Sequence, residues 1–186
     1  MRPWIFLLAF VGALLPGAAF AAKWVMRPKE SSIVLQATFL GSPLKAEFKK
    51  FTAAIEFDPA DLSRSSADVR IDTASFDSQN DDRDEFVTEE PWFYVARFPE
   101  ARFVTRSIRF VSASRYEAVA DLTIRGVTKS VTLPFTVAIE GGVARMSGAI
   151  NLVRTEFGVG QGEWASSDQV GGTVAVSIAV VADRAP

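Results

Sequence analysis

Apolar and polar residues alternate with a period of two along most of this chain. The clearest case spans residues 131–139, where Val131, Leu133, Phe135, Val137 and Ile139 share one parity. This pattern is typical of a half-buried strand. The same pattern predicts seven further strands, at residues 33–39, 44–57, 69–73, 104–110, 116–124, 146–152 and 174–180.

One of these segments contains a change of parity. Phe48 and Phe51 lie on opposite parities, so we expect a β-bulge near Lys49-Lys50. Most connections between the predicted strands are too short for a crossover helix, and Gly141-Gly142 is a typical hairpin signal. Neighbouring strands are therefore expected to be antiparallel.

A single segment, Ser78 to Val95, departs from the strand pattern. It begins with Ser78-Gln79-Asn80-Asp81, which matches a helical capping box, and it continues through Trp92-Phe93-Tyr94. We predict a short helical insertion here. It would act either as a mobile lid over an opening or as a fixed plug in the core.

Eight antiparallel strands can close into a barrel or split into a sandwich. Twelve of the 15 phenylalanines follow residue 21, and most lie on the predicted inward parity. A barrel would use these rings to line an apolar cavity, whereas a sandwich would use them to fill its core. Periodicity alone leaves both all-β architectures open.

The first 21 residues have the features of a secretory signal peptide. Arg2 precedes an apolar run that ends at Pro16-Gly17, and Ala19-Phe20-Ala21 resembles a cleavage site. The run is shorter than the roughly 20 apolar residues of a membrane-spanning helix. We therefore expect a leader at 1–21, one mature domain at 22–186, and export to the periplasm or the medium.

Composition narrows the possible chemistry. The formal net charge is −2 and offers no broad basic surface for nucleic acid. The chain has no cysteine and no histidine, which excludes disulfides, thiolate nucleophiles and the commonest general base. No metal site is expected.

Three local motifs suggest catalysis only weakly. Ser42-Pro43-Leu44-Lys45 has the serine-x-x-lysine spacing of acyl-enzymes but lacks their other signatures. Gly158–Gly162 resembles a nucleotide-binding loop, but no helix signal follows it to provide an anion-binding N-terminus. The carboxylates of the 81–90 segment could form the acid and base of a hydrolase, although a solvated helix face explains them as well. The protein is predicted not to be an enzyme, and the hydrolase is kept as an alternative.

Several segments, in order, resemble the YceI family of periplasmic polyisoprenoid-binding proteins. They are Phe48-Lys49-Lys50-Phe51, Ile55–Pro59, Arg83-Asp84, Trp92-Phe93, Phe98–Phe103, Leu122–Leu133 and Arg154–Gly160. The resemblance implies a lipocalin-like antiparallel barrel of eight strands, with a hydrophobic tunnel for a long isoprenoid or quinone-like amphiphile. It implies no required cofactor and no settled catalytic role. It also suggests a membrane donor or acceptor such as a cytochrome b561.

Candidate ligand-binding residues follow from strand parity and from charge. The predicted lumen residues are Phe39, Phe48, Phe51, Phe57, Phe110, Leu122, Phe135 and Ile150. The head-group candidates are Arg154, Lys45 and Arg125, followed by Lys49, Lys50 and Lys129. Arg154 ranks first because it follows the inward parity of Met146 to Leu152. An inward arginine needs an anionic partner, and if Arg154 is structural, the expected partner is Asp121 or Glu156. The sequence does not distinguish an isoprenoid from a fatty acid or a fatty amide.

Overall fold

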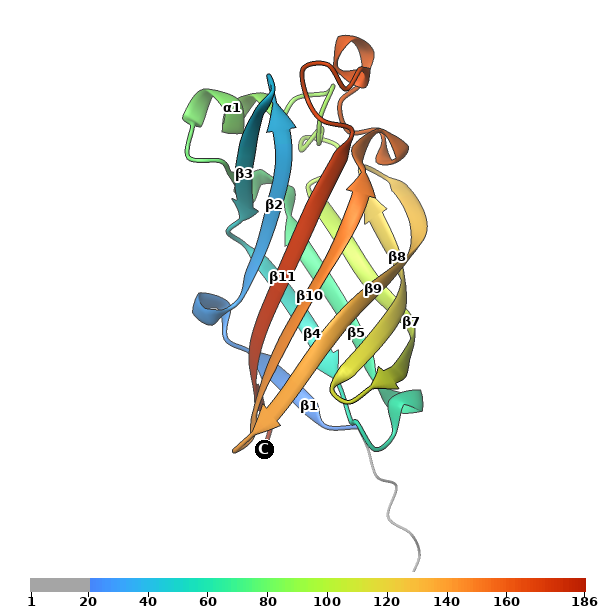
Figure 1. Ribbon diagram of the computed structural model, residues 1–186. Coiled ribbons are helices and arrows are strands. Elements are labelled where there is room, and N and C mark those ends of the chain that lie inside the picture. Colours follow the sequence, from blue (N-terminus) through green and yellow to red (C-terminus); the bar gives the residue numbers. More distant parts are fainter. Residues whose placement is uncertain (1–20) are drawn as a thin grey trace, which may run out of the picture.

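The computed structural model describes residues 21–186 (Figure 1). Apart from Ala21, the leader expected at residues 1–21 lies outside the described residues. Over the described range, no helix is both long enough and apolar enough to cross a membrane.

Strands dominate the described chain, and all of their pairings are antiparallel. The strands are β1 (Lys23–Met26), β2 (Ser32–Phe39), β3 (Ser42–Phe48), β4 (Phe51–Glu56), β5 (Ser66–Asp72), β6 (Phe76–Asp77), β7 (Glu100–Ser112), β8 (Arg115–Ile124), β9 (Val127–Glu140), β10 (Val143–Val153) and β11 (Thr173–Arg184). The α-helix within this range is α1 (Asp81–Phe86), and five short 3₁₀ turns cover Pro28–Glu30, Leu62–Arg64, Thr73–Ser75, Arg154–Phe157 and Gly162–Ala165.

Eight of the strands close into a barrel. Their order is β1-β4-β5-β7-β8-β9-β10-β11, and β11 pairs back onto β1. Closure leaves no free strand edge along this ring, which is how a barrel avoids the exposed hydrogen-bonding groups of an open sheet. The predicted eight-stranded antiparallel barrel with a short helix is confirmed.

The members of the ring differ from those predicted. β11 pairs with β2 through Ala175–Ala179 but with β1 through Ala182–Arg184, so β2 diverges from the ring. Together β2, β3 and β6 form a three-stranded extension that raises one wall of the barrel (Figure 1). The eighth barrel strand is instead β1, which the alternation does not reveal because it has four residues.

The region around Lys49-Lys50 is a corner between two strands, so the expectation of a β-bulge within one strand is wrong. The backbone N–H of Lys49 donates to the carbonyl of Ser75 at 3.0 Å, and the N–H of Lys50 donates to the Ser75 hydroxyl at 3.0 Å. The chain thus leaves the extension at β3 and joins the barrel at β4. Phe48 and Phe51 can both face inward because the corner resets the parity.

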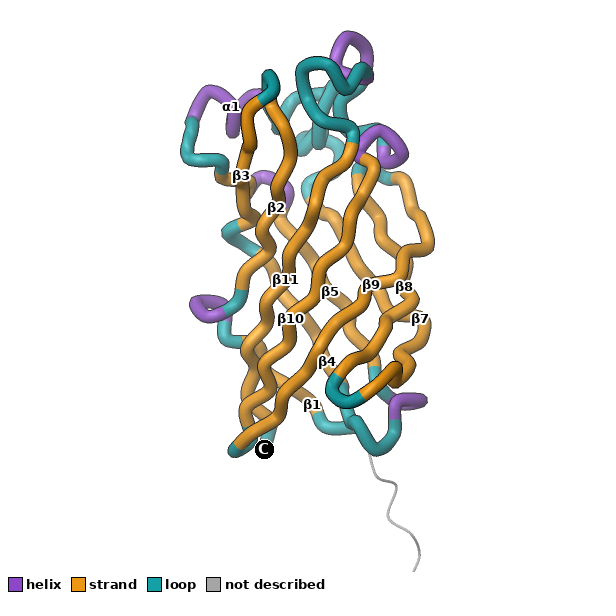
Figure 2. Tube along the Cα trace, viewed as in Figure 1, coloured by secondary structure: helices purple, strands orange, loops and turns teal. Residues whose placement is uncertain are grey.

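The predicted helical insertion contains less helix than expected. Only α1 is helical, and turns continue through Val95. The N-cap is Asn80, whose side chain accepts from the N–H of Arg83 at 2.9 Å, and not Ser78. The Ser78 hydroxyl instead contacts the carboxylate of Asp84 at 2.5 Å. Figure 2 shows α1 and the long loops gathered at one end of the barrel, called the upper end below.

Candidate functional site: two apolar cavities along the barrel

The barrel encloses a cavity of about 220 Å³, called the lower cavity. Inward-facing side chains of all eight barrel strands line it, and β2 and β3 add Ile33, Leu35 and Phe48. The lining is apolar except for Glu56, Ser66 and Thr105. Its volume exceeds that of an engineered cavity of about 150 Å³ that stays dry and binds benzene.

Aromatic residues close the lower end of this cavity. The indole N–H of Trp24 donates to the carbonyl of Phe57 at 2.9 Å. The Phe57 and Tyr116 rings meet edge to face with centroids 5.3 Å apart, and Tyr116 stacks on Phe135 at 5.5 Å. These four residues are buried and form a core cluster. The lower end is therefore packed as a core.

A second cavity of about 330 Å³, the upper cavity, lies beside the α1 end of the barrel. Its walls come from β2, β3, β11, α1 and the loops that follow β6 and β10. Trp92 and Trp164 contribute to this lining, and their ring centroids lie 5.6 Å apart. The volume falls within the range of about 300–1,000 Å³ that is usual for small-molecule sites.

The two cavities follow one another along the strands. On β2, Ile33 lines the lower cavity, Leu35 lines both, and Ala37 lines the upper cavity. On β11, Val176 lines the lower cavity and Val174 the upper one. Alternate residues on one strand face the same side. The cavities are therefore arranged end to end.

Most of the predicted lumen residues face these cavities. The lower cavity is lined by Phe48, Phe51, Phe57, Leu122, Phe135 and Ile150. Phe39 lines the upper cavity. Phe110 lines neither cavity and is 56% exposed, because β7 reaches the rim of the barrel there.

The sequence pattern missed Phe103. It lines the lower cavity together with Thr105 and Ile108, although Phe103 and Ile108 have opposite parities. A register shift between Thr105 and Ser107 accounts for this switch. The strand predicted at 104–110 places Val104 on the inward parity of Ile108, and this is wrong because Val104 precedes the shift.

Arg154 is 5% exposed and lines the upper cavity. The expectation that a carboxylate pairs with Arg154 is wrong, because its guanidinium donates only to backbone carbonyls. The acceptors, at 2.9 to 3.3 Å, are the carbonyls of Val159, Gly160, Ser166, Val170 and Gly171. Asp121 pairs instead with Arg106, and Glu156 with Lys129. Burial lowers the pKa of Arg154.

Arg154 therefore holds loops together. All its nitrogens are engaged by the segments 159–160 and 166–171, and its guanidinium lies 5.6 Å from the Trp92 ring centroid. A ligand phosphate would have to compete with these carbonyls. The geometry favours a structural role over head-group binding.

The other head-group candidates lie away from the cavity linings. Arg125 donates to the carbonyls of Gly158 and Glu90. Lys45 is exposed, and so is Lys50. Lys49 pairs with Glu47 and Asp77, and the Lys129 ammonium lies 2.9 Å from Glu156. Neither cavity is lined by any of these five residues.

Two charged residues outside the predicted ligand-binding set line the upper cavity: Asp82, which belongs to the carboxylates of the hydrolase alternative, and Arg83. Arg83 is half-buried, and its Nε donates to the Ser78 hydroxyl at 2.7 Å. Its guanidinium carbon lies 5.8 Å from the centroid of Phe39. The only sequence feature that pointed to Arg83 was the Arg83-Asp84 pair within the predicted helical insertion. Nothing in the local sequence shows that the Arg83 side chain faces a cavity.

The acidic segment does not converge on the cavity. Asp84 accepts hydrogen bonds from the N–H and the hydroxyl of Ser78. Asp82 is the only carboxylate of the 81–90 segment in the lining of the upper cavity. Within residues 21–186, no three His, Cys, Asp or Glu side chains are grouped as metal ligands.

Comparisons with known proteins agree with this architecture. The crystal structure of Burkholderia cenocepacia BcnA superposes with a TM-score of 0.81 at 32% identity, covering 84% of this chain and 98% of BcnA. A polyisoprenoid-binding domain from Saccharophagus degradans, implicated in plant cell wall breakdown, gives a TM-score of 0.68 at 12% identity and covers 90% and 100%. At that identity the second comparison concerns the fold alone.

Sequence comparison leads to the same family. A UPF0312 protein of Shewanella denitrificans is 34% identical over 140 residues, which are 73% of each chain. The model of the YceI-like domain matches residues 24–182, nearly all of the described range. The chain therefore belongs to the family of YceI-like domains.

Proposed function

We propose that this protein binds and carries a long-chain isoprenoid or a quinone-like amphiphile, with its tail in the two cavities. The observation that carries the proposal is the end-to-end arrangement of two apolar cavities, one inside the barrel and one at its upper end. A tail can extend along this axis without meeting a charged group below the upper cavity, except Glu56.

Burial of the tail provides enough free energy for stable binding. Each buried methylene contributes about 0.8 kcal/mol. Ten buried methylenes thus give roughly 8 kcal/mol before the costs of association, which are several kcal/mol. The fold that this chain shares with a domain described as polyisoprenoid-binding supports the same ligand class.

The charges at the upper cavity favour a neutral head group. Arg83 supplies one cation, but the carboxylate of the adjacent Asp82 would repel a diphosphate. Arg154 has no nitrogen without a backbone acceptor. A quinone carbonyl or an alcohol needs only a single donor, so we place such a head near Arg83.

A binding role without catalysis is part of this proposal. The family and the apolar character of the cavities support it, because hydrolysis needs a positioned acid and base beside the substrate. We also propose export to the periplasm, where a membrane protein such as a cytochrome b561 would donate or accept the lipid.

The test is identification of the ligand by native mass spectrometry and solvent extraction of protein from its own host. Val176→Phe should block the lower cavity, because Val176 lines it. Ser177→Phe is the matched control, because the neighbouring Ser177 is exposed. We expect an isoprenoid or quinone in the wild type and in Ser177→Phe, and much less in Val176→Phe. A bound fatty acid would favour the alternative carrier.

A protein without affinity for any long-chain amphiphile would overturn the proposal. Turnover of an ester or glycoside that is lost in Asp82→Asn would point to the hydrolase instead.

A further inference from the structure

Phe93 lies at the boundary between the two cavities. Among the described residues, only Leu35 and Phe93 line both of them. Leu35 belongs to β2 and is part of the wall. Phe93 belongs to the turns that follow α1, so it reaches the boundary from outside the barrel wall.

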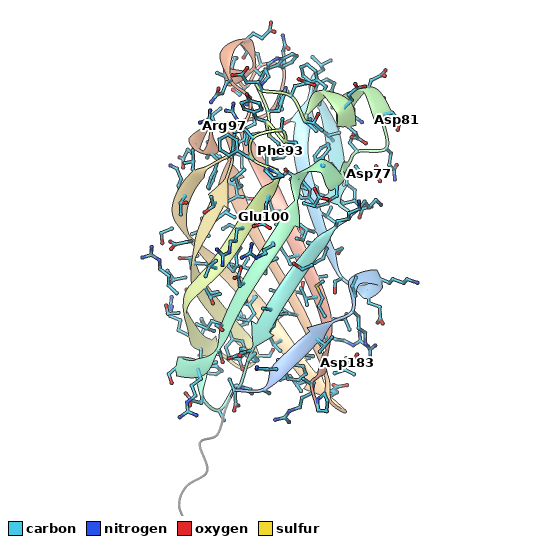
Figure 3. All side chains as sticks on the ribbon, turned by 180° about the vertical axis from the view of Figure 1, so that it is seen from behind. Asp77, Asp81, Phe93, Arg97, Glu100 and Asp183 are labelled. Carbon is cyan, nitrogen blue, oxygen red and sulfur yellow. The ribbon has the colours of Figure 1, made fainter. Side chains whose placement is uncertain are left out.

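Neighbouring aromatic rings hold the Phe93 side chain. Its centroid lies 5.7 Å from that of Phe48 and 6.0 Å from that of Phe76. Phe48 lines the lower cavity and Phe76 the upper one, so the three-ring cluster lies across the junction. Figure 3 shows Phe93 near the upper end of the barrel, opposite the end that carries Asp183.

The backbone on both sides of this ring is fixed. The N–H of Phe93 donates to the carbonyl of Val87 at 3.0 Å, and the N–H of Val95 donates to that of Thr88 at 2.9 Å. Opening of the junction therefore requires rotation of the Phe93 side chain rather than movement of the loop. The ring would lose its contacts with Phe48 and Phe76 as it turned.

We propose that Phe93 is a gate that determines tail-length specificity. Tails that fit the upper cavity bind without moving it, whereas a longer tail must displace the ring before it reaches the lower cavity. This inference rests on the proposed function and identifies the residue that selects among its ligands. Displacing Phe93 breaks two aromatic contacts, so it should weaken the binding of long tails about tenfold, which corresponds to about 1.4 kcal/mol.

The experiment measures the affinity of delipidated protein for geraniol, farnesol, geranylgeraniol and solanesol. In Phe93→Ala, we expect the two longest alcohols to bind about tenfold more tightly than in the wild type. Geraniol should bind with nearly unchanged affinity. Phe93→Leu keeps an apolar side chain at the junction and should show the same trend more weakly, so it replaces Phe93→Ala if that variant does not fold.

Phe39→Ala is the matched control. Phe39 is also an aromatic residue, but it lines only the upper cavity. Its removal should change the affinity for all four alcohols by a similar factor. An equal dependence on chain length in wild type, Phe93→Ala and Phe93→Leu would overturn the gate.

Tryptophan fluorescence reports the position of the tail. Beyond residue 21 the chain has three tryptophans; Trp24 lines the lower cavity, whereas Trp92 and Trp164 line the upper one. In a Trp92→Phe/Trp164→Phe background, a stearic acid with a nitroxide near its methyl end should quench Trp24 more strongly after Phe93→Ala. Equal quenching with and without Phe93 would contradict the gate. Absence of binding in every variant would instead overturn the proposed function, and the gate with it.

Discussion

Gly160 has a φ of +78°, and the guanidinium of Arg154 occupies the space into which a side chain at Gly160 would project. The carbonyl of Gly160 also accepts from Nη1 of Arg154 at 3.3 Å, and its N–H donates to the carbonyl of Pro91 at 2.8 Å. Gly160 thus connects the buried arginine to the insertion that covers the upper cavity.

Gly160→Ala should destabilise the protein for two reasons. A left-handed conformation costs an L residue about 1–2 kcal/mol, and the new Cβ would overlap Arg154. Gly162→Ala is the control, because Gly162 has a φ of +62° with nothing near its Cβ position. Chemical denaturation should show a larger loss for Gly160→Ala. Equal losses would mean that the loop moves aside without cost.

Arg154→Met should be strongly destabilising. It leaves five backbone carbonyls without their donor, and each buried polar group that is left unsatisfied costs about 1–3 kcal/mol. Arg154→Lys should cost less, because an ammonium keeps the charge and three donors. The measurement is the free energy of unfolding in urea.

The same variants test the head-group role. In Arg154→Lys, farnesyl diphosphate and farnesol should lose affinity by the same factor if Arg154 is structural. A selective loss of farnesyl diphosphate would show that the arginine binds the head group after all.

Strand parity predicted most of the cavity lining because it is a local property. Residues such as Leu122 and Ile150 face inward wherever the strand joins the sheet. Parity fails at irregularities. Because the register shifts after Thr105, Phe103 faces the cavity although the pattern predicted the opposite parity. Phe110 is exposed because it lies at the rim of the barrel.

Closure and charge placement could not be predicted because they depend on distant contacts. β1 joins the ring only through β4 and β11, and β11 lies more than 140 residues away along the chain. Arg154 was correctly expected to point inward, but its acceptors come from a loop that has no regular pattern. Neither feature leaves a local signature.

Arg27 and Asp183 should make barrel closure sensitive to acid. Nε of Arg27 lies 2.8 Å from Asp183 Oδ2, and Nη2 lies 2.6 Å from Oδ1, at the junction of β1 and β11. This hydrogen bonding lowers the pKa of Asp183. A carboxyl with a lowered pKa stabilises the folded state above its unfolded value of about 4 and loses that contribution as the pH falls further.

Asp183→Asn should therefore be less stable than wild type at neutral pH, and the difference should shrink below about pH 4. Thermal unfolding across this pH range provides the measurement. Asp168→Asn removes an exposed carboxylate that has no ion pair among residues 21–186, so it should show no such trend. A difference independent of pH would indicate that Asp183 acts through packing.

We predict that the expected leader is cleaved after Ala21, which leaves Ala22 as the first residue. The carbonyl of Ala22 accepts from the N–H of Phe57 at 2.9 Å, and that of Lys23 accepts from Ala185 at 2.8 Å. Cleavage further along would remove part of β1. N-terminal sequencing of the exported protein tests this, and a first residue other than Ala22 would contradict it.

The insertion should behave as a plug with a mobile helix. The Pro91 carbonyl accepts from the N–H groups of Gly160 and Gln161, both at 2.8 Å, and Val87 and Trp92 are buried. α1 has no buried residue, and its Asp82 and Arg83 face the upper cavity. Hydrogen exchange should therefore be slow at Phe93 and Val95 with and without lipid, and fast in α1 until lipid is added.

The opposite result at Phe93 and Val95 would identify a lid. If both amides exchange rapidly in the empty protein and gain protection with lipid, the whole segment opens during loading. Gly160→Ala, which disturbs the loop that holds Pro91, should then accelerate lipid release. If the segment is a plug, Gly160→Ala should lower the stability of the protein and leave the rate of lipid release unchanged.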